Sequence, residues 1–183
     1  MSSLFPEYFA LFGIAPQFGI DPEQLTRAYR EVLSQVHPDR FAGAGPAERR
    51  AAMQLASHAN EAYEVLRNDS ARAAYLCRRQ GMVIDGAGAV PLPPAFLERQ
   101  MLWHEQLDEA RAAGDGAAIA ALMRDVAENR ETALRQIAQC IDERQDDPAA
   151  AAAVRSLMFL EKLGGDIARV AAERNDASAS EKE

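Results

Sequence analysis

The stretch Val36-His37-Pro38-Asp39-Arg40 decides how the first half of this 183-residue sequence is organised. Proline has no backbone N–H and disfavours helical geometry in the residue before it, so a helix that leads into this stretch must end there. An imidazole, a rigid turn and a carboxylate are therefore presented together at a helix end. The triplet alone is of middling specificity, and its meaning depends on the segments that flank it.

Amphipathic helices are predicted on both sides of the triplet. Asp21-Pro22-Glu23 starts the first one, with an N-cap aspartate, a proline at the first helical position and an acid in the first turn. The second begins near Pro46, and its alanines allow a close approach to the first. The apolar stripes are Leu25, Tyr29, Val32, Leu33 and Val36 in the first helix, and Ala52, Leu55, Ala56, Ala59, Tyr63 and Leu66 in the second. These stripes predict an antiparallel hairpin with the triplet at its tip.

The polar face of the first helix carries Arg27, Arg30 and Ser34, opposite the apolar stripe. Two interpretations are open for this face. The arginines are either solvated side chains of an ordinary amphipathic helix, or a small basic docking face that runs up to His37. Shorter helical pieces are predicted before and after the hairpin, over residues 8–14 and 71–80.

Three further motifs lie around the triplet: Ala28-Tyr29-Arg30-Glu31-Val32-Leu33 before it, and Ala59-Asn60-Glu61-Ala62-Tyr63-Glu64-Val65-Leu66 and Arg72-Ala73-Ala74-Tyr75 after it. In this order and spacing they resemble a J domain, the module that stimulates ATP hydrolysis by DnaK-type chaperones. One departure is Asp69-Ser70, where many J domains have Asp-Pro, and it should weaken the stop after the second helix. The resemblance implies a J domain over residues 1–80 whose chaperone-binding residues are His37, Pro38, Asp39, Arg27, Arg30 and Arg40.

Residues 81–94 hold three glycines and three prolines, which predicts a linker over 81–93 between two halves of the chain. Helices are then predicted at about 94–113, 115–144 and 147–173, with breaks at Gly114 and Asp146-Asp147-Pro148. Their seams are Ile119, Leu122, Met123, Val126, Ala133, Ile137 and Ile141 in the middle helix, and Leu157, Leu160, Gly164, Ile167 and Ala171 in the last. Short connections imply antiparallel neighbours, so we expect an all-α fold with a C-terminal three-helix bundle over 94–174 and a frayed tail over 175–183.

The first helix of this bundle carries more apolar residues than one core stripe needs. Phe96, Trp103, Leu107 and Ala110 align on one face and are sufficient for the core contact. A second set of apolar residues lies roughly 100° to 240° around the helix from Phe96, in a sector shared with acidic residues. This set is Leu97, Met101 and Leu102, beside Glu98, Glu105 and Glu109, and on the last helix Phe159 is displaced about 100° from its stripe. The pattern fits either a helix buried on two sides with stray surface apolars, or an exposed apolar patch with an acidic rim, as protein-binding sites have.

The motifs Phe96-Leu97, Leu107-Asp108-Glu109 and Arg155-Ser156-Leu157-Met158-Phe159-Leu160-Glu161-Lys162-Leu163 are similar to those of the HscB co-chaperones of iron–sulfur cluster assembly. With the J-domain motifs, this resemblance covers nearly the whole chain. It implies that the cluster scaffold protein IscU is contacted by Leu97, Met101, Leu102, Glu105, Glu109 and Phe159, and that the chaperone is HscA-like. Glu98 falls where relatives can carry an apolar residue.

Composition excludes several other classes of protein. The net charge of −8 and pI near 5.0 argue against nucleic acid or an anionic membrane as the main partner. Cys77 and Cys140 form no C-x-x-C motif, so neither a zinc site nor a disulfide framework is predicted, and buried thiols in a reducing cytosol are the simplest interpretation. With no secretion signal and no run of about 18 apolar residues, we expect a cytoplasmic protein.

Two other functions fit the sequence less well. A hydrolase could use His37, Asp39 and Cys77, but Cys77 lies in a separate apolar helix with no base at motif spacing. A helix-turn-helix DNA binder would have only Arg49 and Arg50 near the start of its recognition helix. We therefore predict an adaptor that is not an enzyme and needs no cofactor or metal, and that delivers an IscU-like scaffold to an HscA-like ATPase. A J-domain co-chaperone for a different client is the alternative.

Overall fold

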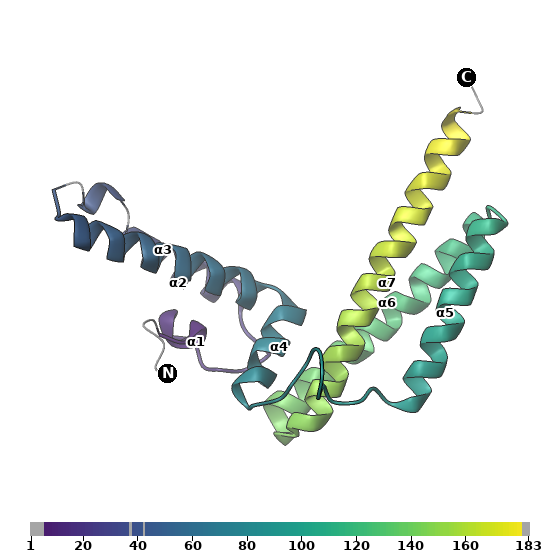
Figure 1. Cartoon of the computed structure of the whole chain (residues 1–183), viewed down its shortest axis with the longest axis horizontal. Coiled ribbons are helices and arrows are strands. Elements are labelled where there is room, and N and C mark those ends of the chain that lie inside the picture. The colour runs from purple at the N-terminus through teal and green to yellow at the C-terminus, as the bar shows by residue number, and fades with distance from the viewer. Residues whose placement is uncertain (1–5, 37, 42, 181–183) are drawn as a thin grey trace. The chain divides into compact units, whose positions relative to one another are not determined.

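The computed structural model describes residues 6–36, 38–41 and 43–180, which form helices and connecting loops without a β-strand (Figure 1). The chain divides into two compact units, residues 1–79 and 80–183. The first holds a helical hairpin with accessory helices, and the second holds a three-helix bundle. The predicted all-α fold is confirmed.

The first unit is built on a hairpin of two long helices. Its elements are α1 (Tyr8–Leu11), α2 (Pro22–Val36), the 3₁₀ helix η1 (Pro38–Phe41), α3 (Pro46–Arg67) and α4 (Asp69–Arg79). Asp21 caps α2 as predicted, because its Oδ1 accepts the backbone N–H of Glu23 at 2.8 Å. The loop from η1 leads into α3, where the Glu48 carboxylate accepts the backbone N–H of Gly45 at 3.1 Å. The N-terminus of each long helix therefore has a carboxylate acceptor for an N–H group.

Stacked aromatic rings and small residues hold α2 against α3. The Tyr29 and Tyr63 rings are nearly parallel, with centroids 4.2 Å apart. The Tyr29 hydroxyl donates to Asn60 Oδ1 at 3.0 Å, and the hydroxyls of Thr26 and Tyr63 are 3.2 Å apart. On α3, Ala52, Ala59, Ala62 and Leu66 are buried. The small side chains let the two helix backbones approach closely, as the alanine-rich stripe predicts.

A single residue, Asn68, separates α3 from α4. Its backbone leaves the helical region (φ −96°, ψ 123°), and its Oδ1 accepts the backbone N–H of Ala71 at 2.8 Å. The helix that the sequence predicted to start at Ala71 therefore starts two residues earlier, at Asp69. The side-chain oxygen of Asn68 thus performs the cap, and the Asp69-Ser70 pair lies inside the new helix.

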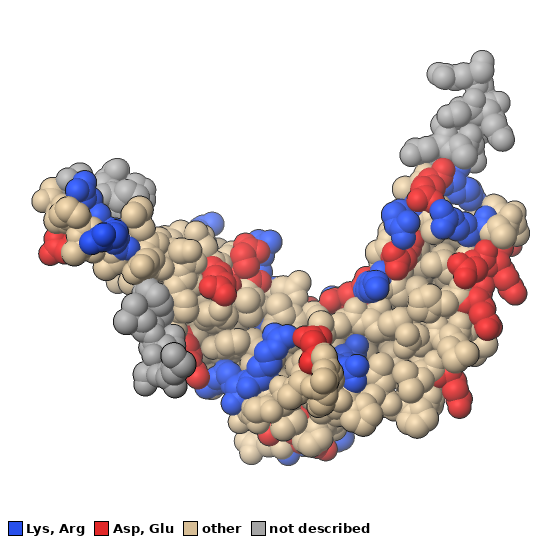
Figure 2. Space-filling model, viewed as in Figure 1, with Lys and Arg blue, Asp and Glu red and all other residues tan. Residues whose placement is uncertain are grey.

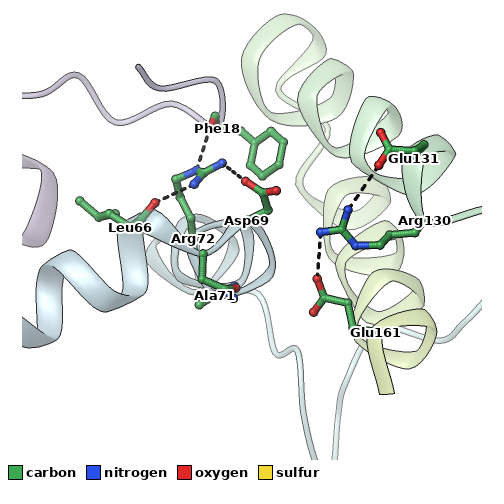
Figure 3. Close-up of polar contacts among 9 residues, drawn as sticks. Phe18, Leu66, Asp69, Ala71, Arg72, Arg130, Glu131 and Glu161 are labelled. Atoms are coloured by element: carbon green, nitrogen blue, oxygen red, sulfur yellow. Dashed lines mark hydrogen bonds and ion pairs between the residues drawn. The ribbon is translucent and has the colours of Figure 1, made fainter. Parts of the chain in front are cut away.

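Arg72 joins three segments of the first unit from a buried position (Figure 3). Its guanidinium donates to the carbonyls of Phe18 at 2.8 Å and Leu66 at 2.6 Å, and it pairs with the Asp69 carboxylate at 2.6 Å. The guanidinium carbon also lies over the Phe18 ring, 4.8 Å from its centroid. A buried charge is tolerated where it is fully hydrogen-bonded, and here it ties the segment before α2 to the α3–α4 corner.

The short helix α1 packs on the same end of the hairpin. Phe9 is buried, and the Tyr8 ring stacks on Tyr75 with centroids 4.6 Å apart. The ring of His58 forms a hydrogen bond with the carbonyl of Pro6 at 2.8 Å. Burial, followed by a hydrogen bond with Glu61, raises the pKa of Tyr8 to about 12. The prediction that this segment forms a turn or two of helix on a larger body is confirmed.

The second unit is a three-helix bundle of α5 (Pro94–Ala112), α6 (Gly116–Ala138) and α7 (Asp147–Ser180), with the π-helical turn η2 (Gln139–Arg144) extending α6. The α6–α7 interface is the most extensive in the bundle, and α5 is more lightly attached. The core includes Trp103 and Leu107 of α5, Ile119, Leu122, Val126, Ala133 and Ile137 of α6, and Val154, Leu157, Leu160, Leu163, Ile167 and Val170 of α7.

Details of the bundle differ from the sequence predictions. The middle helix does not run unbroken to residue 144, because η2 follows α6 and Gln145 then takes a left-handed conformation (φ 54°). Met123, assigned to the core seam, is 39% exposed. The last helix continues to Ser180 instead of ending near 173.

The glycine- and proline-rich segment before α5 folds back on itself. The backbone N–H of Val90 donates to the carbonyl of Val83 at 3.2 Å, and Ile84 is buried. The Arg155 guanidinium of α7 donates to the carbonyl of Val90. Composition alone describes this segment as a linker, but its contacts make it part of the second unit.

Candidate protein-binding surfaces

The exposed side of α2 is the first candidate surface. Arg27, Arg30 and Ser34 are exposed, as their helical spacing predicts. Together with Thr26 and Glu31 they line a shallow depression along the helix. Glu23 also lines it, so the depression carries two arginines and two glutamates, which suits a partner segment that has charged and polar side chains.

The triplet itself is only partly visible. His37 lies outside the described residues, and Pro38 and Asp39 begin η1, where their backbone is described but their side chains are not. Arg40 is exposed, and its guanidinium donates to the carbonyl of Ser34 at 3.3 Å. A cation bound to a carbonyl in the last turn of α2 interacts favourably with the helix dipole. Arg40 therefore connects η1 to the end of the helix that carries Arg27 and Arg30.

The second candidate surface is on α5. Leu97, Met101 and Leu102 are 46%, 65% and 55% exposed, which is unusual for large apolar side chains on one helix. Glu98, Glu105 and Glu109 are also exposed. Figure 2 shows acidic side chains gathered along the α5 side of the second unit. Of the two interpretations that the sequence left open, the geometry favours an exposed apolar patch with acidic neighbours over a helix buried on two sides.

Phe159 of α7 is half-buried and lies within an aromatic cluster, unlike the more exposed Leu97, Met101 and Leu102 of α5. Its ring centroid is 5.6 Å from that of Phe96, 6.3 Å from Trp103 and 5.6 Å from His104. At about 100° per residue, His104 lies roughly 20° around α5 from Leu97. The structure therefore brings Phe159 to the side of α5 that carries both His104 and Leu97. Part of its ring is left available to a partner.

The residues assigned to the patch do not all share one side of α5. At about 100° per residue, Leu97 and Met101 are roughly 40° apart, whereas Leu102 is about 100° beyond Met101. Leu102 lines a depression between α5 and α6 together with Arg99, Gln106 and Asp125. Glu109 lines a neighbouring depression whose floor includes Ala110, Ala118 and Leu122. The predicted surface thus extends over the crest of α5 onto both of its flanks.

Three polar or aromatic residues beside this surface were not singled out for it from the sequence: Arg99, His104 and Asp125. Asp125 accepts the indole N–H of Trp103 at 2.6 Å and pairs with Arg99 at 2.7 Å. The Arg99 guanidinium also lies over the Trp103 ring. The spacing of Arg99 and Trp103, four residues apart, is the only sequence signal for this cluster, because Asp125 comes from another helix.

Comparison with known proteins agrees with the two-unit architecture. Residues 7–75 match the family model of the DnaJ domain, and residues 92–168 match that of the HSCB C-terminal oligomerisation domain. A co-chaperone HscB homolog of Bordetella petrii is 46% identical, covering 88% of this chain and 94% of the relative. One of Paraburkholderia phymatum is 42% identical, covering 91% and 95%. The chain belongs to the HscB co-chaperone family.

Solved HscB structures share the fold. The chaperone HscB from Vibrio cholerae superposes with a TM-score of 0.79 at 32% identity, covering 92% of this chain and 99% of that one. Human co-chaperone HscB superposes with a TM-score of 0.81 over 91% of this chain and 82% of that one. At 22% identity the human protein supports the fold alone. The first unit is accordingly a J domain and the second an HscB C-terminal domain.

The surroundings of the two cysteines argue against the hydrolase that would use Cys77. Cys77 and Cys140 are buried and form no disulfide, and burial raises the pKa of the Cys140 thiol. A nucleophile at the position of Cys77 would be out of reach of a substrate. Over the described ranges, no cluster of three or more His, Cys, Asp or Glu side chains could hold a metal ion. In that same part of the chain, the helices are too short or too polar to cross a membrane.

Proposed function

We propose that this HscB-family co-chaperone stimulates the ATPase of an HscA-like, DnaK-type chaperone and delivers an IscU-like iron–sulfur scaffold to it. In this assignment, chaperone docking lies in residues 1–80 and scaffold binding in 94–174, with 81–93 between them. The observation that carries the proposal is the exposure of Leu97, Met101 and Leu102 in a chain that also has a J domain. The protein would act in the cytoplasm.

Scaffold binding is assigned to the α5 surface and Phe159. Exposed leucine and methionine side chains supply the apolar centre that protein interfaces require, and methionine adapts to irregular partners. Glu105 and Glu109, both exposed, form an acidic rim on the same helix. Such a rim favours a partner whose own contact surface is basic around an apolar centre.

Chaperone docking is assigned to the α2 face and the triplet. Arg27 and Arg30 would meet an acidic strip on the ATPase and act mainly on the association rate. Asp39 would accept charge-assisted hydrogen bonds from a partner arginine, with Pro38 fixing the turn and His37 packing beside it. Arg40, which is hydrogen-bonded to the end of α2, would add positive charge next to the triplet.

Stimulation would arise because this contact favours the hydrolysis-competent conformation of the ATPase. The chain itself would supply no group to the chemical step. Its contribution is to hold client and chaperone at once, which converts a bimolecular encounter into a local one and raises the effective concentration of the client.

The test is a single-turnover ATPase assay of an HscA-like chaperone with scaffold, with this chain, and with both. We expect the two together to stimulate hydrolysis more than the sum of their separate effects. Additive effects would exclude the two-site adaptor. To identify the client, the full chain would be used in a pull-down from cytosol, with Leu97→Ala/Met101→Ala as the control. Recovery of a different protein that depends on the same two residues would support a J-domain co-chaperone for another client.

A further inference from the structure

Asp125 connects α6 to α5, because both oxygens of its carboxylate accept hydrogen bonds from α5. Its Oδ2 accepts the indole N–H of Trp103 at 2.6 Å. Its Oδ1 accepts from the Arg99 guanidinium at 2.7 Å and from the Asn129 amide at 3.1 Å. Asn129 also donates to the backbone carbonyl of Asp125, one turn away on the same helix. The carboxylate is thereby held in one orientation from two sides.

Trp103 connects Asp125 to Phe159, because it is hydrogen-bonded to the first and stacked on the second. The tryptophan is 1% exposed, and its ring lies nearly parallel to that of Phe159, at an interplanar angle of 17°. Phe96 packs edge-on against both rings, at 75° and 87°. The orientation of the Phe159 ring is therefore defined by neighbours on α5, and the most deeply buried of these is hydrogen-bonded to Asp125.

This arrangement matters because α5 is the most lightly attached helix of the bundle. A half-buried phenylalanine next to a loosely held helix would sample several ring orientations, and a partner would have to order it on binding. Fixing the ring beforehand removes that entropic cost and improves affinity without adding a contact. The Arg99 guanidinium, which lies over Trp103, reinforces the same position.

We propose that Asp125 is a positioning residue for scaffold binding, which holds Phe159 in its binding orientation through Trp103. The inference rests on the proposed function, because it takes Phe159 to be a scaffold contact. Asp125 itself does not need to touch the scaffold.

The experiment compares the full chain with Asp125→Ala and with Glu128→Ala. The control removes one acidic side chain from the exposed surface of the same helix and leaves the three hydrogen bonds of Asp125 in place. Trp103 is the only tryptophan of the chain, so its indole N–H gives a single side-chain signal in an ¹⁵N-correlated NMR spectrum. That signal should shift and exchange faster with water in Asp125→Ala and stay in place in Glu128→Ala.

Affinity for an IscU-like scaffold is then measured by calorimetry for Asp125→Ala in the wild-type and Phe159→Ala backgrounds. We expect Asp125→Ala to weaken binding about three- to tenfold in the wild type, as for loss of one hydrogen bond, and to have almost no effect in Phe159→Ala. Equal weakening in both backgrounds would overturn the inference. So would an unchanged affinity with a displaced indole signal.

Trp103→Phe provides a second test, because it keeps an aromatic ring in the core while it removes the N–H donor together with part of the indole ring. It should weaken binding as much as Asp125→Ala does, and the double variant should be no weaker than either. An unchanged affinity in Trp103→Phe would overturn the inference. If Phe159→Ala itself leaves the affinity unchanged, Phe159 is not a scaffold contact and the inference fails, whereas the α5 surface stands or falls with Leu97→Ala and Met101→Ala.

Discussion

The helical hairpin of the first unit and the bundle of the second differ in how far their candidate binding residues contribute to the stability of the fold. On α2, Arg27 and Arg30 are exposed, while the helix is held to α3 by other side chains such as Tyr29. On the bundle, Leu97 and Met101 are equally separate from the core, but Phe159 belongs to the aromatic cluster that joins α5 to α7. Binding and stability are therefore separable on the hairpin and partly shared on the bundle.

The largest effect is expected at the triplet, where binding should be lost without any change in folding. His37→Gln should abolish stimulation of the partner ATPase, because the imidazole beside the Pro38 turn would be missing from the contact. Helicity by circular dichroism and the melting temperature should remain those of the wild type. His58→Gln is the matched control, since His58 lies near the middle of α3 and is hydrogen-bonded to the carbonyl of Pro6. Retained stimulation in His37→Gln would remove the triplet from the site.

The next largest effects are expected on the scaffold surface, where only Phe159 should contribute to both binding and stability. Leu97→Ala and Met101→Ala should each weaken scaffold binding about tenfold, with no change in the melting temperature, because both side chains are exposed. Phe159→Ala should weaken binding and also lower the melting temperature, because it removes three ring contacts.

Met123→Ala serves as the control for the scaffold calorimetry, because Met123 is an exposed methionine of α6. Its affinity should match the wild type. If Leu97→Ala or Met101→Ala unfolds the bundle, these side chains belong to the core and the patch does not exist.

Substitution of one arginine in each unit tests how much the stability of that unit depends on its ion pairs. The Arg72 side chain is 8% exposed and Arg130 is 35% exposed. Arg72→Met should destabilise the first unit by about 3 kcal/mol, since it removes three hydrogen bonds, to the Phe18 and Leu66 carbonyls and to Asp69, from a buried position. Arg130→Met, which removes the contacts to Glu131 and Glu161 (Figure 3), should cost under about 1 kcal/mol. Urea unfolding of both variants measures the difference, and equal losses would contradict it.

A smaller effect is expected from the arginines of α2. Arg27→Ala/Arg30→Ala should slow association with the ATPase a few-fold, and the deficit should shrink as salt is added. Stopped-flow binding at two ionic strengths measures this. Arg49→Ala/Arg50→Ala removes the same charge from exposed positions of α3 and should have the smaller effect. A deficit independent of salt would show that the α2 arginines act by packing instead of by charge.

The smallest effect concerns alkaline pH. The raised pKa of Tyr8 means that the folded state favours the neutral phenol. This contribution to stability is fully present below pH 10 and is lost as pH rises toward about 12. Tyr8→Phe should therefore lose less stability than the wild type between pH 9.5 and 11.5, measured by urea unfolding. A parallel decline of both proteins would place the titration elsewhere.

Helix positions and the separation of apolar from charged faces were predictable because they depend on local spacing. Asp21 caps α2, and Leu97, Met101 and Leu102 lie off the core face, both as predicted. The break after the second long helix was predictable from the cap-like residues Asn68, Asp69 and Ser70, but the sequence did not identify Asn68 as the residue that caps α4. Any of these polar residues is a reasonable cap in sequence, and only the backbone path selects one.

What could not be predicted depends on contacts between distant segments. Asp125 is an unremarkable acid in its own helix, and its role follows only from the packing of α6 beside Trp103. The same holds for Met123, which lies at a seam position by heptad spacing but is 39% exposed, in a depression that α6 forms with Ala171 and Arg174 of α7. The half-burial of Phe159 likewise reflects three rings from another helix.

The contacts of residues 80–93 determine where the second unit can be cut. Ile84 is buried, and Arg155 of α7 donates to the carbonyl of Val90. A fragment that starts at Pro94 would therefore expose the surface that Ile84 covers and leave a half-buried guanidinium without its acceptor. A fragment that starts at Gln80 keeps both contacts. For separating the scaffold-binding half from the J domain, the boundary of choice lies before the glycine-rich segment instead of after it.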